Sequence, residues 1–338
     1  HGFVPGRGGS RLGCDAPPGR LWGRVRRWLG SGNDVTDRST LSLSDYLAKV
    51  GVHVEAALER AVDWIRRTVP QEVGAAVAHG VLSGGKRLRP ILFAAAYRAA
   101  GGEGQAEAIY DTAVGTELIH AYSLMHDDLP CMDDAELRRG RATTHRIHGV
   151  DVTVRAGAAL IPAAARQVLA GAVRLGLSPV GARAVAMALM DAAGASGMVG
   201  GQALDLLGEE RLLSGVELDE LHRHKTGALL TAACAMGAMA AGADAHVVEA
   251  FRRYGESVGL AFQVADDILD ATSTAEELGK EPSDAELGKS TYVALFGLEE
   301  ARRRGQGLAG GAKEALESVG VDAAPLFALA DYTVDRRR

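Results

Sequence analysis

The stretch from His246 to Ala271, HVVEAFRRYGESVGLAFQVADDILDA, places apolar residues three or four positions apart and ends in an acidic cluster. This spacing predicts an amphipathic helix, and a four-residue step puts Asp266 and Asp270 on one helix face. Similar patterns predict helices over about 43–69, 105–128, 152–176, 181–206 and 217–242. No sustained strand-type alternation interrupts them. The sequence therefore predicts an all-α fold.

A further acidic cluster lies at Asp127-Asp128-Leu129-Pro130-Cys131-Met132-Asp133. A regular helix would turn Asp127 and Asp133 away from each other, because they are six residues apart. Pro130 removes a backbone donor and disrupts the preceding turn, so a distorted helix end can bring both carboxylates together. We call Asp127, Asp128 and Asp133 the first aspartate cluster, and Asp266, Asp267 and Asp270 the second.

Clustered carboxylates repel one another unless protons, bases or metal ions compensate their charge. Mg²⁺ suits such oxygen ligands and completes its shell with water and phosphate oxygens. A metal-bound diphosphate is therefore the expected ligand.

Basic residues accompany the acidic clusters. Gly84-Gly85-Lys86-Arg87-Leu88-Arg89-Pro90 combines glycines, which permit close backbone approach, with Lys86 and Arg89 as phosphate donors. Further basic groups occur at Arg138, Arg139, Lys225, Lys280 and Lys289. These are more sites than one phosphate needs. We expect two diphosphates, one held through Mg²⁺ and one held directly by lysine and arginine.

Composition narrows the protein class. The chain has 338 residues, a net charge of −6 and three cysteines without metal-like spacing. The length favours a large core, and the negative net charge gives no sign of a nucleic-acid partner. The cysteine content fits a reducing, cytoplasmic compartment. Residues 1–40 are Arg- and Gly-rich and are expected to be disordered, with organelle targeting left open. The domain is expected over residues 41–338, without a transmembrane segment.

Six segments together resemble the trans-isoprenyl diphosphate synthases, also called polyprenyl synthetases. They are GGKRLRP, HDDLPCMDDAELRRG, GGQALDL, HKTGALL, FQVADDILD and LGKEPSDAELGKSTY. The resemblance covers about 43–336. It implies one large helical bundle around a central apolar cavity, and a homodimer. It also implies Mg²⁺-dependent, head-to-tail condensation of isopentenyl diphosphate with an allylic diphosphate.

The same resemblance implies roles for individual residues. It assigns Mg²⁺ coordination, with three ions around the allylic diphosphate, to Asp127, Asp128, Asp133, Asp266, Asp267 and Asp270. It assigns allylic diphosphate contacts to Arg138, Lys225, Thr226, Gln263 and Lys280, with Arg138 and Lys225 also catalytic. It assigns isopentenyl diphosphate contacts to Lys86, Arg89, His120 and Arg139.

Product length is expected to depend on what blocks the pocket below the first aspartate cluster. Tyr122 lies five residues before Asp127, about 7.5 Å along a helix axis, and Ser123 follows it. A tyrosine there resembles the bacterial farnesyl diphosphate synthases, so a C15 product is expected first, C20 second and C10 third.

Three other functions compete. A terpene cyclase would carry an Asn/Ser/Glu second motif, and a head-to-head synthase would carry Asp-x-x-x-Asp twice. A regulatory subunit of a prenyltransferase heteromer commonly lacks aspartates that this chain retains. Two positions depart from the family pattern: Ala158 replaces an acid expected to be buried, and Pro282 replaces a small flexible residue.

Overall fold

The computed structural model describes residues 42–208, 211–272 and 290–335. The expectations for residues 1–40, Lys280, Lys289 and Pro282 fall outside these ranges.

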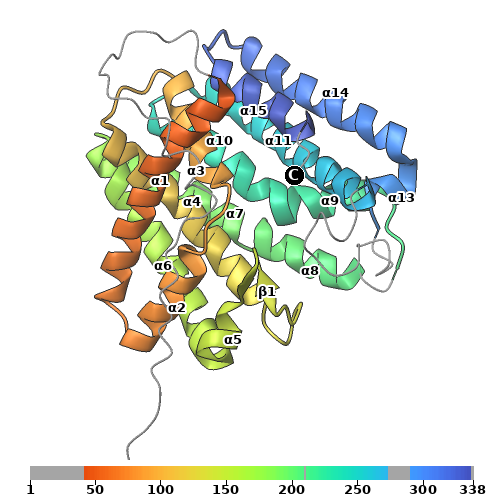
Figure 1. Ribbon diagram of the computed structural model, residues 1–338. Helices are drawn as coiled ribbons and strands as arrows, with labels where there is room; N and C mark the ends of the chain where they lie inside the picture. The colour runs from red at the N-terminus through yellow and green to blue at the C-terminus, as the bar shows by residue number, and fades with distance from the viewer. Residues whose placement is uncertain (1–41, 209–210, 273–289, 336–338) are drawn as a thin grey trace, which may run out of the picture. The chain divides into compact units, whose positions relative to one another are not determined.

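Helices dominate the described chain and confirm the all-α prediction (Figure 1). A short antiparallel hairpin pairs Leu137 with Ala142. The elements are α1 (Leu43–Arg66), α2 (Gln71–Val81), α3 (Leu88–Ala99), α4 (Ala106–Asp127), β1 (Leu137–Arg138), β2 (Arg141–Ala142), α5 (Thr144–His148), α6 (Val150–Arg174), α7 (Pro179–Ala193), α8 (Met198–Gly208), α9 (Gly215–His222), the π-helical turn η2 (Arg223–Gly227), α10 (Ala228–Ala240), α11 (Ala245–Thr272), α13 (Tyr292–Phe296), α14 (Leu298–Glu317) and α15 (Ala324–Asp335).

The helix predicted over 181–206 is interrupted. α7 ends at Ala193, and α8 begins at Met198 after a turn in which Gly197 N donates to Gly194 O over 3.0 Å. Glycine at both ends of the Gly194–Gly197 turn lowers the cost of leaving the helix. The segment over 217–242 is likewise divided, into α9, η2 and α10.

Helix α10 lies in the middle of the bundle. Nearly all of its side chains are buried, and it packs against α3, α7 and α11. A Cβ added at Gly237 would stand 2.8 Å from Ala96 Cβ, so the small residue permits the close approach of α3. The apolar, small-residue character of this segment therefore reflects close helix packing.

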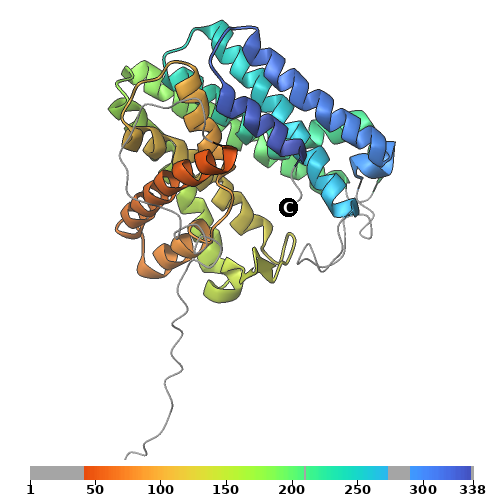
Figure 2. The ribbon, with the colours of Figure 1, turned by 45° about the horizontal axis from the view of Figure 1, so that its top comes forward.

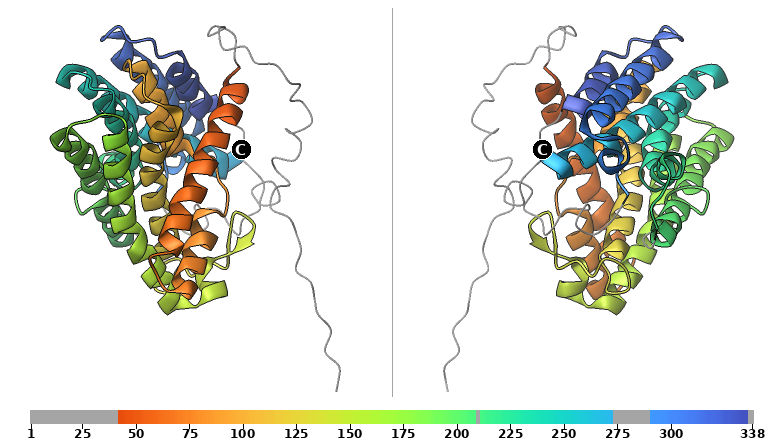
Figure 3. Two further views of the ribbon diagram at one scale, coloured as in Figure 1. Left: turned by 90° about the vertical axis from the view of Figure 1, so that its left-hand side faces the viewer. Right: turned by 90° about the vertical axis from the view of Figure 1, so that its right-hand side faces the viewer.

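The C-terminal helices form one side of the bundle. α14 packs along α11, and α15 packs against both (Figures 1, 2 and 3). Helix α11 also contacts α9 and α13. This packing orients the second aspartate cluster.

Two segments are long and apolar enough to cross a membrane by length and composition alone, Val150–Arg174 and Pro179–Gly208. Half of the apolar window of the first is buried inside the protein, and the second consists of α7 and α8 with a turn between them. Core helices of globular proteins meet the same criteria, so this finding is weak evidence for a membrane span.

The acid expected to be buried at position 158 has no buried place in this chain. Ala158 lies on the exposed side of α6, whereas Gly157 beside it is buried against His126. Position 158 therefore lies on the outer face of α6 within a single copy of the chain, and the effect of losing the acid stays a prediction.

Gly171 fixes how closely α6 crosses α4. A Cβ at this position would lie 2.8 Å from Thr112 Cα, which is backbone and cannot rotate away. Gly171→Ala is therefore expected to destabilise the protein by about 1–3 kcal/mol, measured by denaturant unfolding. Gly311→Ala is the matched control, because Gly311 lies within α14 with no atom near the added methyl group. It is expected to stabilise by about 0.5–1 kcal/mol; equal effects at both sites would contradict the packing argument.

Candidate active site

The second aspartate cluster lies near the end of α11. Asp266 and Asp270 are one helical turn apart in a continuous helix, so the predicted shared face is confirmed. Asp267 is buried, and its Oδ2 accepts a hydrogen bond from Tyr292 N over 2.7 Å. The cluster therefore has two half-buried carboxylates on one face and a third tied to α13.

Tyr292 links Asp267 to a second buried network. Its hydroxyl donates to Asp219 Oδ1 over 2.6 Å, and Arg304 from α14 also pairs with Asp219. The sequence analysis did not predict that Tyr292 supports the cluster, although Tyr292 ends the LGKSTY segment that resembles the family. Asp219 and Arg304 carried no sequence signal.

The first aspartate cluster begins where α4 ends. Beyond Asp127 the chain folds back, so that Asp133 N donates to Asp127 O over 2.9 Å and Asp134 N to Leu129 O over 3.1 Å. Asp134 adopts a left-handed φ of 44°, which the tight return requires. The predicted distorted helix end is confirmed: it brings the backbones of Asp127 and Asp133 together.

Asp127 is the electrostatic centre of this cluster. Its burial raises the pKa of the carboxyl to about 6, against the opposing effect of Lys225, and the Asp133 carboxylate raises the pKa further. Lys225 of η2 therefore lies within electrostatic range of Asp127 at the end of α4. The structure therefore brings together two residues predicted to act on one diphosphate.

Arg138 contacts the first cluster directly. It approaches Asp128 Oδ1 with Nε at 2.7 Å and Nη2 at 2.6 Å, and Asp128 is buried. The hairpin β1–β2 thus carries a guanidinium to the end of α4.

Lys225 lies in η2, a π-helical turn, a geometry that is rare and frequent at functional sites. Its ammonium group pairs with Asp205 of α8. A Cβ at Gly201 would stand 2.5 Å from Lys225 Cα, so the glycine lets α8 approach this turn. Sequence reasoning missed Asp205, although it lies in the GGQALDL segment. Thr226 follows Lys225 in η2 and Gln263 lies on α11; both are partly buried.

A cationic cradle forms around the turn between α2 and α3. We use this name for Lys86, Arg89, His120 and Arg139. Arg139, from the tip of the hairpin, donates to Gly84 O, and a Cβ at Gly85 would lie 2.5 Å from Arg139 Nη1. Gly85, with a φ of 136°, therefore makes room for the guanidinium, whereas Gly84, with a φ of 88°, supplies the carbonyl acceptor.

Within the cradle, Arg89 Nε is buried and finds no hydrogen-bond partner among the described residues. The pKa of His120 lies well below its ordinary value, first because of burial and then because of the Arg89 and Arg139 guanidinium groups. His120 is therefore a neutral imidazole beside two guanidinium groups. Lys86 is exposed in the turn between α2 and α3. Such a group of donors suits a phosphate anion.

The two predicted chain-length residues differ in their surroundings. The Tyr122 ring is partly buried and meets the His126 ring edge-on, with centroids 4.9 Å apart. Ser123 Oγ donates to His120 O over 3.0 Å, within its own helix. Tyr122 therefore carries an aromatic ring on α4, five residues before Asp127, whereas Ser123 is bonded to its own helix.

Across the described ranges, no three His, Cys, Asp or Glu side chains stand close enough together to form a complete metal site. Mg²⁺ needs only one or two carboxylates when water and substrate phosphate supply its other ligands. The donor set fits that ion, because the two clusters consist of carboxylates and like charge already raises the Asp127 pKa.

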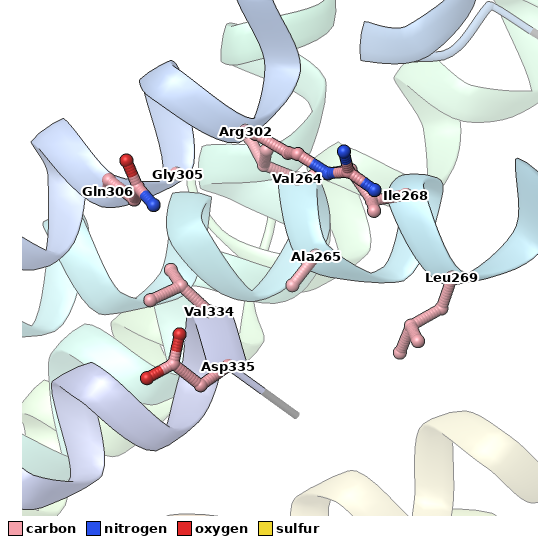
Figure 4. A pocket seen from close by; sticks show the side chains of 9 residues that line it. All are labelled: Val264, Ala265, Ile268, Leu269, Arg302, Gly305, Gln306, Val334 and Asp335. Carbon is pink, nitrogen blue, oxygen red and sulfur yellow. The ribbon is translucent and has the colours of Figure 1, made fainter. Parts of the chain in front are cut away.

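A cavity of about 250 Å³ lies between α11, α14 and α15. Figure 4 shows its lining, with Val264 and Ile268 from α11, Arg302 and Gln306 from α14, and Asp335 from α15. These α11 residues occupy the opposite helix face from Asp266 and Asp270. None of the predicted site residues lines this cavity.

Comparisons with known proteins bear on this arrangement. The family model of the polyprenyl synthetases matches residues 70–318. A dimethylallyltranstransferase of Fischerella ambigua is 40% identical, covering 90% of this chain and 86% of the relative. The chloroplastic geranylgeranyl pyrophosphate synthase 9 of Arabidopsis thaliana is 41% identical, covering 91% and 84%. The farnesyl diphosphate synthase of Escherichia coli is 43% identical, covering 77% and 88%.

A solved structure agrees with these relatives. The FPP/GFPP synthase of Zymomonas mobilis superposes with a TM-score of 0.72 at 31% identity, covering 85% of this chain and 99% of that one. Fold, family model and relatives coincide over the elements that carry both aspartate clusters and the cationic cradle. The chain is a trans-prenyltransferase and belongs to the polyprenyl synthetase family.

Proposed function

We propose that this enzyme condenses isopentenyl diphosphate with dimethylallyl diphosphate and then with geranyl diphosphate, giving farnesyl diphosphate, with Mg²⁺ as cofactor. The observation that carries the proposal is the separation of two kinds of anion site. Carboxylates of the first aspartate cluster lie with Lys225 and Arg138 at the end of α4 and at η2, which packs against α11. The cationic cradle is a separate group of basic side chains, on which the buried Glu117 acts.

The aspartate side is proposed for the allylic substrate. Asp127, Asp128, Asp133, Asp266, Asp267 and Asp270 would hold Mg²⁺, which supplies Lewis-acid stabilisation of the departing diphosphate. Of these, Asp128 also pairs with Arg138, and Asp267 also accepts from Tyr292 N. Lys225 and Arg138 would donate to its oxygens as the allylic C–O bond breaks. Both cations pair with carboxylates, Asp205 and Asp128, which orient them.

The cationic cradle is proposed for isopentenyl diphosphate. Arg89 and Arg139 would bind its phosphates, and neutral His120 would donate or accept a single hydrogen bond. Holding this substrate by protein groups alone leaves its double bond free to attack the allylic cation. The new C–C bond forms, and a proton then passes to the released diphosphate. No protein base is required, and apolar walls keep water from the cation.

Chain length is the finer part of the proposal. Tyr122 places an aromatic ring one and a half turns below Asp127, which supports a short product. The relatives named above include synthases of both C15 and C20 products. Geranylgeranyl diphosphate is therefore the alternative.

Two further properties are proposed with it. Apolar side chains stand exposed on α6 and α7, among them Val154, Val173, Val180 and Met187, and a second copy of the chain would cover them. A cytoplasm-like, reducing compartment fits the cysteine content. Sedimentation velocity tests the dimer directly.

The first test is a product assay. Purified protein is incubated with Mg²⁺, isopentenyl diphosphate and dimethylallyl diphosphate, and the dephosphorylated products are separated by mass spectrometry. We expect farnesol, and no product after chelation of the metal. Geranylgeraniol would retain the enzyme class and overturn the C15 assignment. Turnover that persists in excess chelator would contradict the Mg²⁺ proposal.

A further inference from the structure

Arg87 differs from the other arginines around the cationic cradle, because its side chain is almost entirely buried. It follows Lys86 in the turn before α3 and adopts a left-handed φ of 49°. Its side chain is only 4% exposed. A buried guanidinium on a strained backbone persists only where its surroundings hold it firmly.

The contacts of Arg87 reach three helices. Nε donates to Glu55 Oε1 of α1 over 2.8 Å, and Nη1 donates to Glu117 Oε1 of α4 over 3.0 Å. Nη2 donates to Val81 O, at the end of α2, over 2.9 Å. The guanidinium therefore points away from solvent and binds protein acceptors through all three nitrogens.

Glu117 is a carboxylate that acts on two of the cradle cations, Arg89 and Arg139. It is buried, and its Oε2 has no hydrogen-bond partner within the described ranges. Burial lowers the pKa values of Arg89 and Arg139, and in each case Glu117 is the main opposing charge. Burial also acts on Arg87, but Glu117 and Glu55 more than reverse it and raise the pKa of this residue. One carboxylate therefore lies within electrostatic reach of three guanidinium groups.

We propose that Arg87 is a positioning residue that occupies Glu117, so that Arg89 and Arg139 stay available to bind isopentenyl diphosphate. A buried carboxylate that loses its partner must find another cation. The candidates on which Glu117 already acts are Arg89, which has an unpartnered Nε, and Arg139. Either new pair would compete directly with the substrate phosphates. This inference rests on the proposed role of the cradle.

The test measures steady-state kinetics and calorimetric binding of isopentenyl diphosphate in Arg87→Met. We expect KM and Kd for this substrate to rise about tenfold, with kcat at saturation within about threefold of wild type, because ground-state binding is lost. The double variant Arg87→Met/Glu117→Gln removes the competing carboxylate together with its partner. It is expected to return both constants to within about threefold of wild type.

Two further variants complete the design. Arg87→Lys keeps a cation beside Glu117 and is expected to retain a KM close to that of wild type. Arg60→Met removes a cation of α1 that pairs with α4, where Arg60 Nη2 lies 2.6 Å from buried Asp111 and Nε lies 3.8 Å from Glu107. It is expected to lower the unfolding temperature without changing KM, which separates positioning from a general loss of stability.

The outcomes discriminate between roles. A double variant as impaired as Arg87→Met would overturn the inference, because Arg87 would then be a direct phosphate ligand. An unchanged KM in folded Arg87→Met would reduce it to a structural residue. If the wild type binds isopentenyl diphosphate but transfers no prenyl group, the proposed function fails. The calorimetric Kd values then still test the role of Arg87.

Discussion

Asp127→Asn is expected to lower kcat for prenyl transfer about 10³-fold, the usual scale for losing one group that stabilises developing charge. Asparagine keeps the shape of the side chain and removes the charge that would attract Mg²⁺. Asp127 is the carboxylate on which Asp133, Lys225 and Arg138 all act, so its loss affects the whole allylic side of the site. Single-turnover assays with dimethylallyl diphosphate, with the fold checked by circular dichroism, measure this effect.

Asp134→Asn supplies the matched control. Asp134 belongs to the same acidic stretch but is 59% exposed, and the His145 and Arg146 side chains lie 3.9 and 3.8 Å from its carboxylate. Its replacement is expected to change kcat by less than about threefold, as for an exposed charge. If Asp127→Asn turned over as fast as this control, the metal assignment of the first aspartate cluster would be wrong.

Tyr122→Ala is expected to lengthen the product by at least one C5 unit, from C15 to C20 or beyond. The Tyr122 ring meets the edge of the His126 ring, one turn further along α4, with centroids 4.9 Å apart. His126 in turn abuts Gly157, which has no side chain that would occupy the gap. Removing the ring should open a channel for the growing chain, and mass spectrometry of the dephosphorylated products shows its length.

The controls for this experiment come from the same helix. Tyr122→Phe keeps the ring and is expected to leave the product unchanged. Tyr110→Ala removes a tyrosine from α4 that stacks on His53 with centroids 5.0 Å apart, more than three turns from Tyr122. It is expected to affect stability alone. A C15 product from Tyr122→Ala would place the floor of the pocket elsewhere.

Local features were accessible from the sequence because helices have a fixed period. The apolar spacing gave α1, α4, α6 and α11 to within a few residues, and the four-residue step fixed the common face of Asp266 and Asp270. Pro130 indicated the distorted end of α4, and Gly84 and Gly85 indicated a turn open to close approach. Each of these depends on neighbours within one or two turns of chain.

The break between α7 and α8 shows the limit of such reasoning. An apolar period over 181–206 is compatible with one helix or two, and glycines inside helices are common enough to leave the choice open. The choice is made by packing: Gly201 brings α8 against η2, and a straight continuation of α7 would follow a different path. Tertiary contact overrides a locally acceptable pattern.

The sequence by itself determined that this protein is helical, that its acidic clusters are paired with basic segments, and which family those segments resemble. Only the tertiary structure decided which charged side chains pair with one another. It paired Lys225 with Asp205 and bonded Tyr292 N to Asp267. It also paired buried Arg87 with Glu117, while Arg89, two positions later, belongs to the cationic cradle. Periodicity is a property of neighbouring residues, whereas an ion pair between α1 and α4 depends on how two distant helices pack, which no local pattern encodes.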